Sequence, residues 1–325
     1  MMNQWKTWTR GLAVVALCPT LGFAQVQSHA DWPNRAVKII VAYPAGQSTD
    51  IATRYFAEKL SRALGQGFVV DNRPGASGNI GTAAAARATP DGYTLVMGAS
   101  GTHAMNPALF PNPGFDADKD FDAIALTALI PFAISAGAGA PVNSLTELIA
   151  LTRSKPGTVD AAIPSVTGQL VLEMLKQRDV PLFGIRFKGS ADAMTATLGG
   201  HVPVLIDTVA ATRTQLGKVK VLAVTTTTSM ASMPGVKTAS EQGLPNFTIA
   251  AWNALMVPKG VPAEIQLKLA TEMRKILELP ETQKALGDLG FERAPALNPT
   301  ELTAWLREER RNYAQVIQAA HMKPD

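Results

Sequence analysis

Residues 37–64 read VKIIVAYPAGQSTDIATRYFAEKLSRAL, and this stretch decides the fold. Its first part, 38–43, is a short apolar run rich in β-branched residues, which is typical of a strand buried in a parallel sheet. From 50 to 64 the apolar residues recur every three or four positions, which predicts a helix with one buried face. The helix is expected to be capped by one of three short polar residues, Ser48, Thr49 and Asp50. The loop before the helix therefore offers unpaired backbone N–H groups that could bind an anion.

Two further strands end in polar loops like the first. A strand is expected at 67–71, followed by the glycine-rich loop 72–81, and another at 93–98, followed by the polar loop 99–102. Glycines allow the backbone to approach a ligand closely. Their spacing here is not the dinucleotide fingerprint, and no phosphate-loop Lys-Ser/Thr follows. Because loops at the C-terminal ends of parallel strands share one edge of the sheet, the three loops are expected to converge on one cleft.

The middle of the chain repeats this scheme and predicts a second domain. A strand is expected at 121–129, the chain crosses near Pro131, and 132–136 starts a new sheet. Later strands are expected at 159–163, 182–187, 202–206 and 219–224. A long strand at 247–257 is expected to return the chain to the first domain, where the last helix begins at Asn298 with a proline and a glutamate in its first turn.

These patterns predict an α/β protein with two lobes joined by two crossings. Domain 1 is expected to comprise 31–131 plus 254–325, and domain 2 to comprise 132–253. The architecture is that of a two-lobed periplasmic binding protein, type II-like, a Venus flytrap with a hinge of two crossing strands. Such a hinge would let the lobes close around a solute.

The N-terminus has the features of an export signal. Lys6 and Arg10 precede the apolar segment 11–17, and small residues follow at the positions that a signal peptidase reads, so 1–24 is interpreted as a signal peptide. The apolar segment is far shorter than the roughly 20 residues that span a bilayer. Lipidation at Cys18 remains an alternative, although Leu17 is bulky for a lipoprotein signal. A second possible cleavage site lies at 28–30. The interpretation places the mature protein in the periplasm.

Composition excludes several classes of function. With 325 residues, 46% of them hydrophobic and 17% charged, the chain can bury two cores and is not disordered. The formal net charge of +4 would fall to +2 without 1–24, and such a charge predicts no nucleic-acid partner. One cysteine and four histidines make a dedicated zinc site improbable. No cofactor and no metal are expected.

Several motifs resemble those of the Bug family of extracytoplasmic solute receptors, the substrate-binding subunits of tripartite tricarboxylate transporters. The most specific are Asn72-Arg73-Pro74-Gly75-Ala76-x-Gly78-Asn79-x-Gly81 and Pro90-Asp91-Gly92-Tyr93-Thr94-Leu95. Others are Trp32-Pro33-Asn34-Arg35, Pro44-Ala45-Gly46-x-x-x-Asp50, Lys188-Gly189-Ser190, Leu222-Ala223-Val224-Thr225 and Gly243-Leu244-Pro245. The resemblance extends from about Trp32 to Pro324, nearly the whole mature chain.

The resemblance implies a monomeric periplasmic receptor whose lobes close around a small carboxylate and deliver it to the membrane permease subunits. Dicarboxylates, tricarboxylates, acidic amino acids and aromatic acids all fit that class. It also implies that one carboxylate is held by the first two loops of domain 1, partly through ordered water. The residues carried over for this role are Ala45, Gly46, Ser48, Asp50, Ser77, Gly78 and Asn79, joined by Ser100 and Gly101.

The remaining candidate residues mark where the chain departs from the family or where domain 2 faces the cleft. Gln47 stands where the family usually has a second glycine, the loop 163–168 lacks the usual glycine-rich Ser/Thr motif, and Phe187 replaces a usual tyrosine. The candidates from domain 2 are Ser165, Thr167, Lys188, Gly189, Ser190 and Asp207. Because the departures fall where distal contacts set specificity, the identity of the ligand stays open.

Two titratable residues and two rival functions complete the sequence-based hypotheses. Asp207 would repel a second carboxylate but could accept from an ammonium or a hydroxyl group, or it could simply cap the next helix. His103 is interpreted as mainly structural. A ligand-loaded partner of a periplasmic sensor kinase is an alternative to transport. A hydrolase is disfavoured because no Gly-x-Ser-x-Gly elbow occurs and general bases are few.

Overall fold

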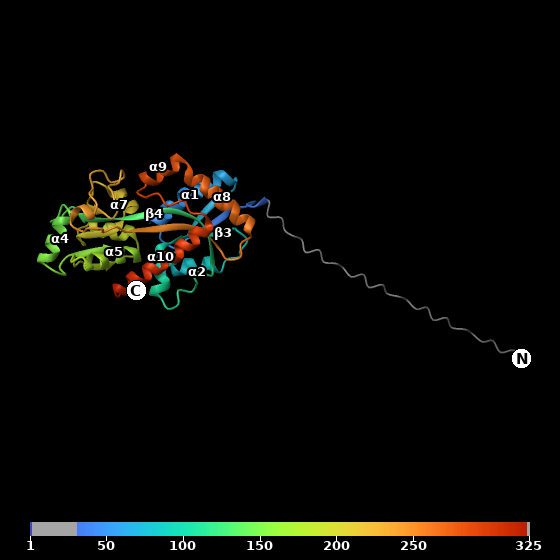
Figure 1. The fold of residues 1–325 in the computed structure, drawn as a ribbon, viewed down its shortest axis with the longest axis horizontal. Helices are drawn as coiled ribbons and strands as arrows, with labels where there is room; N and C mark the ends of the chain where they lie inside the picture. The colour runs from blue at the N-terminus through green and yellow to red at the C-terminus, as the bar shows by residue number, and fades with distance from the viewer. Residues whose placement is uncertain (2–30, 324–325) are drawn as a thin grey trace.

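The computed structural model describes Met1 and residues 31–323. Residues 31–323 form two α/β lobes side by side along the long axis of the molecule (Figure 1). The predicted signal peptide at 1–24, Cys18 and the second cleavage site at 28–30 therefore lie outside the described residues. Within the described part of the chain, no helix is long and apolar enough to cross a membrane.

The first lobe is built on three parallel strands, with β1 (Val37–Val41) hydrogen-bonded between β2 (Phe68–Asn72) and β3 (Thr94–Ala99). Its helical elements are α1 (Ser48–Leu64), η2 (Ala76–Gly78), α2 (Asn79–Ala86), η3 (Gly101–Met105), α3 (Asn106–Leu109), α8 (Ala263–Glu278), α9 (Pro280–Asp288) and α10 (Pro299–Ala319). Ile39 of β1 and Phe56 and Leu60 of α1 have no exposed surface. The opening stretch therefore forms the predicted strand, loop and helix, with the apolar helix face in the core.

The second lobe repeats the arrangement with β5 paired in parallel to β6 and β7. Its strands are β5 (Asp160–Ile163), β6 (Phe183–Arg186), β7 (Val204–Thr208) and β8 (Val219–Val224). Its helical elements are α4 (Leu145–Ser154), α5 (Val166–Gln177), α6 (Ser190–Leu198), α7 (Val209–Thr212), η4 (Arg213–Gln215) and η5 (Ser240–Gln242).

Two long antiparallel strands, β4 (Phe121–Gly137) and β9 (Ala250–Pro258), run between the lobes. The sheet order is β2-β1-β3-β9-β4-β7-β5-β6, with β8 also paired to β4. In Figure 1 both strands extend along the middle of the molecule. The proposed domain boundaries, 131/132 and 253/254, fall within these two strands.

The two strands expected at 121–129 and 132–136 are one continuous strand, so the predicted break between them was wrong, whereas the predicted change of sheet near Pro131 is present. Pro131 pairs with Ala250 at the end of the β4–β9 ladder, and Phe132 begins the ladder to β7 by pairing with Thr208. Proline has no N–H to donate, which usually ends a central strand. Here it lies where the strand changes partner, so the missing donor does not interrupt either ladder.

The start of α1 also differs from expectation. The helix begins at Ser48 with Gln47 as its N-cap residue, and no side chain caps it. Asp50 instead lies in the first turn and accepts a hydrogen bond from the N–H of Gly46 at 2.9 Å. By contrast, the predicted cap at Asn298 is present, and its side chain and that of Glu301 form a reciprocal capping box.

Candidate ligand-binding site

A small cavity lies between the two lobes at the ends of β1, β3, β5 and β7. Its volume is about 40 Å³, which leaves room for a few water molecules. Half of the sixteen candidate residues line it: Gln47, Ser48, Ser100, Gly101, Ser165, Thr167, Ser190 and Asp207. The cavity therefore brings together candidates from the first and third loops of lobe 1 and from lobe 2.

Several helices direct their N-terminal ends at this cavity. Ser48 and Thr49 are the first residues of α1, Ser165 precedes α5, and Ser190 begins α6. The N–H groups of a first helical turn have no acceptor within the helix, and the helix dipole is positive there. No Lys, Arg or His is among the described residues that line the cavity. An anion bound here would be stabilised by backbone N–H groups and hydroxyls instead of by a formal positive charge.

Asp50 fixes the first loop and does not line the cavity. Its carboxylate binds Arg54 at 2.9 Å and Asn72 at 3.0 Å, besides the N–H of Gly46. Burial alone would raise the pKa of Asp50, but these partners hold it below its ordinary value. The carboxylate is thus committed to holding the loop, together with Ala45 and Gly46, in the conformation that presents Ser48 and Thr49.

The second loop lies beside the cavity without lining it. The backbone carbonyl of Ser77 and the side chain of Asn79 both accept hydrogen bonds from the amide of Asn106, at 2.9 and 2.7 Å. Gly78 has φ +92°, and a Cβ there would lie 2.6 Å from the side chain of Thr102. Ser77, Gly78 and Asn79 thus pack against the third loop in this structure, and their predicted contact with a ligand stays a prediction.

The lobes touch across the cavity. The amide Nε2 of Gln47 donates to the carbonyl of Pro164 at 3.5 Å, a long hydrogen bond, and lies 3.3 Å from the position that a Cβ on Gly189 would occupy. The hydroxyl of Thr167 contacts the sulfur of Met105 at 3.5 Å. Lys188 is exposed and outside the cavity. These contacts describe a closed arrangement, with the side chain of Gln47 occupying space at the interface.

Asp207 is a buried carboxyl group on the cavity wall. It is 2% exposed, its Oδ1 accepts from the N–H of Thr208 at 2.7 Å, and its Oδ2 has no hydrogen-bond partner among the described residues. Burial raises the pKa of Asp207 to about 6, against the opposing effect of the nearby Ser190 and Thr208. Thr208 caps α7, so Asp207 itself is not the cap. Its uncommitted oxygen could accept a hydrogen bond from a ligand.

Some cavity residues were not among the candidates. They are Tyr43, Thr49, Ala99, Ile130, Phe132, Val166, Thr208, Ala251 and Trp252. Burial raises the pKa of Tyr43 to about 12, so its phenol is a neutral donor beside Thr102. The one feature of the sequence that could have marked Tyr43 as a cavity residue was its position at the end of a predicted strand. Ile130, Phe132 and Trp252 read as ordinary core residues, and only their place on the crossing strands brings them to the cavity.

His103 has a structural role, as the sequence suggested. It is fully buried, its Nδ1 lies 2.9 Å from the hydroxyl of Thr102, and its ring packs against Phe121 with centroids 4.9 Å apart. Burial, with a smaller contribution from the charge of Arg310, lowers the pKa of His103 to about 3. It does not line the cavity.

Comparisons with known proteins match nearly the whole chain. The sequence model of the family described as "Tripartite tricarboxylate transporter family receptor" matches residues 52–322. A UPF0065 protein of Bordetella bronchiseptica is 34% identical over 96% of this chain and 93% of its own length. Protein BugT of Bordetella pertussis is 30% identical over 97% of this chain and 98% of its own length.

Solved structures agree in fold. "R. palustris Rpa4515 with adipate" superposes with a TM-score of 0.86 at 31% identity, covering 90% of this chain and 100% of that one. "Structure of periplasmic binding protein BugD" superposes with a TM-score of 0.83 at 31% identity, covering 90% of this chain and 99% of that chain. "MatC (Rpa3494) from Rhodopseudomonas palustris with bound malate" superposes with a TM-score of 0.78 at 30% identity, covering 88% of this chain and 100% of that chain. The predicted two-lobed binding-protein fold is therefore confirmed.

Proposed function

The chain belongs to the tripartite tricarboxylate transporter receptor family, and on that premise we propose that it binds a small carboxylate between its lobes and presents it to the transporter's membrane subunits. It is a periplasmic solute-binding protein and not an enzyme, because the family is one of receptors. The observation that supports the carboxylate most is the convergence of helix N-termini on the cavity between the lobes.

One carboxylate of the ligand is held at the start of α1. The N–H groups of Ser48 and Thr49 lie in the first turn of the helix, and both residues line the cavity. Ser165 and Thr167 approach from α5 in the other lobe. A ligand that contacts α1 and α5 together would stabilise the closed arrangement by its higher affinity for that state.

The other end of the ligand meets Asp207. Above pH 6 this carboxylate repels a second carboxylate and accepts from a donor, so the favoured ligand carries a hydroxyl or an ammonium group near its second acid. Two structurally similar proteins support a small acid as the ligand, because MatC is described with bound malate and Rpa4515 with adipate. Malate has the hydroxyl that Asp207 would accept from, and adipate has none.

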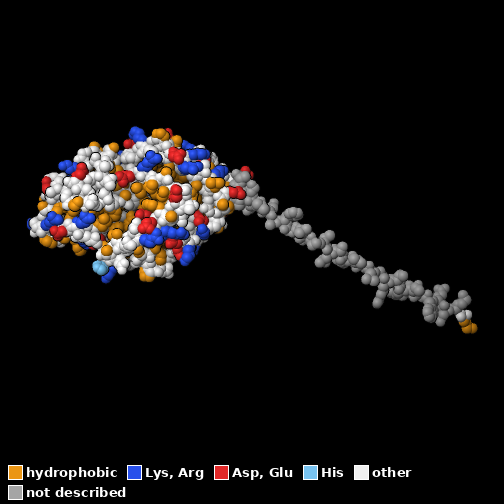
Figure 2. All heavy atoms as spheres, in the orientation of Figure 1, with side chains coloured by type: hydrophobic (Ala, Val, Ile, Leu, Met, Phe, Trp, Pro, Cys, Tyr) orange, Lys and Arg blue, Asp and Glu red, His pale blue; other side chains and the backbone are white. Residues whose placement is uncertain are grey.

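The cavity must open before a ligand can enter. Its 40 Å³ holds a few waters, and the contact between Gln47 and Pro164 closes it. β4 and β9 are the elements that join the lobes, so bending at Pro131 and its partner Ala250 would separate them. Figure 2 shows positive and negative side chains interspersed over one face of the molecule.

A thermal-shift screen tests this function. Ligands that bind only the folded state raise its stability, so we expect a shift with hydroxy- or amino-dicarboxylates at pH 7.5 and a smaller one with the parent dicarboxylates. Absence of a shift with every acid, in protein shown by circular dichroism to be folded, would contradict carboxylate binding.

We also propose that 1–24 is a signal peptide that is removed on export. Intact-mass measurement of the protein recovered from the periplasm would show loss of those 24 residues. A mass that retains them, or that carries an acyl addition at Cys18, would contradict this cleavage.

A further inference from the structure

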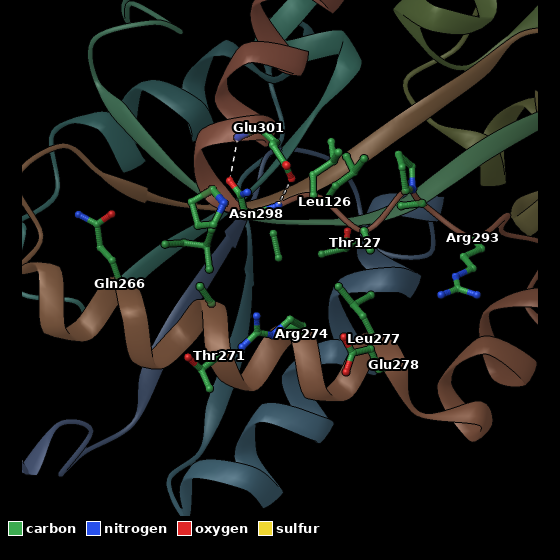
Figure 3. Close-up of a pocket in the computed structure, with 18 of the residues that line it drawn as sticks. Leu126, Thr127, Gln266, Thr271, Arg274, Leu277, Glu278, Arg293, Asn298 and Glu301 are labelled. Carbon is green, nitrogen blue, oxygen red and sulfur yellow. Dashed lines mark hydrogen bonds between the residues drawn. The ribbon is translucent and has the colours of Figure 1, made fainter.

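A second and larger cavity lies on the first lobe. Its volume is about 550 Å³, within the roughly 300–1,000 Å³ range of small-molecule sites. We call it the α8 groove, because it is bounded by α8, by residues 124–127 of β4 and by the segment 293–298 (Figure 3). It shares no lining residue with the cavity between the lobes. A ligand in the groove would therefore contact none of the residues that line the proposed carboxylate site.

The groove is long and mostly apolar. The lining residues of α8 run from Ala263 to Glu278 at three- and four-residue spacing, so they form one face of the helix over about 22 Å. Leu267 on this face is 69% exposed, while Leu126 in the floor is 3% exposed. Ala270 in the middle of the face is small and leaves the groove open. Such a shape fits an extended hydrocarbon chain better than a compact acid, since covering exposed apolar surface is favourable.

Two arginines give the groove its charge. Arg274 reaches up from α8, and Arg293 lies apart from it, with Leu277 and Glu278 between the two in the view of Figure 3. Neither makes a hydrogen bond or an ion pair with any described residue. The guanidinium group is suited to binding a carboxylate through two parallel hydrogen bonds. Two unpaired guanidiniums beside apolar surface therefore indicate an anionic head on an apolar body.

Most other polar side chains of the groove are already engaged. Gln266 donates to the carbonyl of Val261 at 2.8 Å, and Glu301 accepts from the N–H of Asn298 at 2.9 Å in the capping box. Glu278 is the one acidic side chain of the lining without a partner among the described residues. The uncommitted charge is therefore two positive against one negative, which favours a ligand with a single negative charge.

We propose that the α8 groove is a second ligand site that binds an elongated monocarboxylate, such as a free medium-chain fatty acid. The hydrocarbon chain lies along α8 over Leu267 and Ala270, and the carboxylate lies at Arg274, with the charge of Arg293 further favouring an anion in this part of the groove. This proposal does not depend on the ligand of the cavity between the lobes.

Isothermal titration calorimetry with dodecanoate, kept below its micelle-forming concentration, tests the proposal. We expect saturable one-to-one binding that the double variant Arg274→Gln/Arg293→Gln weakens at least tenfold. Dodecan-1-ol, which lacks the charge, should bind the double variant and the wild type alike. Arg62→Gln removes an exposed arginine of α1 outside the groove and serves as the matched control, with unchanged dodecanoate affinity.

A second variant separates the groove from the cavity. Ala270→Phe fills the groove and should abolish binding of both dodecanoate and dodecan-1-ol, while far-UV circular dichroism and the thermal shift with a short dicarboxylate stay unchanged. Three results would overturn the proposal: no saturable dodecanoate binding, the same affinity in the double arginine variant, or competition between dodecanoate and the short dicarboxylate.

Discussion

Asp207 is a carboxyl group whose burial on the cavity wall is unfavourable for its charged form. It lines the cavity with one oxygen unpartnered, and burial raises its pKa from 3.8 to about 6. The protonated form is therefore favoured in the folded state. Its contribution to stability is complete below pH 4 and is lost as the pH rises through about 6.

We predict that Asp207→Asn stabilises the ligand-free protein at pH 8 by up to about 3 kcal/mol and has little effect at pH 4. The amide keeps an acceptor for the N–H of Thr208 but carries no charge to bury. Urea unfolding at both pH values would measure the difference. Asp192→Asn, which removes an exposed carboxylate of α6, should show no comparable gain at pH 8. Destabilisation by Asp207→Asn at pH 8 would contradict the assignment.

Gln47 is the residue at which this chain departs from the family in the first loop, and its side chain contacts the opposite lobe. We predict that Gln47→Ala weakens the ligand-free closed state by two- to fivefold, which corresponds to about 0.5–1 kcal/mol for one neutral hydrogen bond. Small-angle scattering should report a larger radius of gyration without ligand. Gln169→Ala changes a glutamine that bonds to Glu173 within its own lobe and should leave the scattering unchanged.

Gly78 shows how closely the second and third loops pack. Its φ of +92° and the 2.6 Å separation that a Cβ would have from Thr102 both oppose any side chain. We predict that Gly78→Ala destabilises the protein by about 1–3 kcal/mol in urea unfolding. Gly287 of α9 has open space around it, and Ala there should instead add about 0.5–1 kcal/mol. Equal effects of the two variants would show that the loops are not held as described.

The N-terminal cap of α10 was predicted from the local sequence, and the structure contains it. Asn298 accepts from the N–H groups of Thr300 and Glu301, each at 3.0 Å. We predict that Asn298→Ala lowers the free energy of unfolding by about 1 kcal/mol. Thr303→Ala, one turn into the same helix at a half-buried position, should cost less than half as much in the same chemical unfolding experiment. Equal losses for the two variants would argue against the cap.

The elements were largely predictable because each depends on a local pattern. The apolar run of β1, the periodic face of α1 and the cap of α10 are readable within a few residues of sequence. The continuous β4 was not, because only the change of partner at Pro131 makes a proline tolerable in that strand. The cap of α1 was missed for a similar reason, since Asp50 finds Arg54 and Asn72 through tertiary structure.

The site was predictable only in part. Loop residues that follow strands, such as Ser48 and Ser165, reached the cavity as expected, and their role as ligand contacts remains a prediction. Ile130, Phe132 and Trp252 reach it because β4 and β9 cross between the lobes, and nothing near these residues in sequence marks that crossing. A wall made by two strands from distant parts of the chain is a property of the assembled molecule.

Isothermal titration calorimetry of the wild-type protein and two serine variants with malate at pH 7.5 tests carboxylate capture most directly. Ser48 lines the cavity, whereas Ser154 is an exposed serine of α4 outside it and serves as the matched control. We predict one-to-one binding that Ser48→Ala weakens about tenfold or more, as expected for a hydrogen bond to a charged group, and that Ser154→Ala leaves unchanged. No binding by folded wild-type protein, or the same loss with Ser154→Ala, would contradict a carboxylate held at the start of α1.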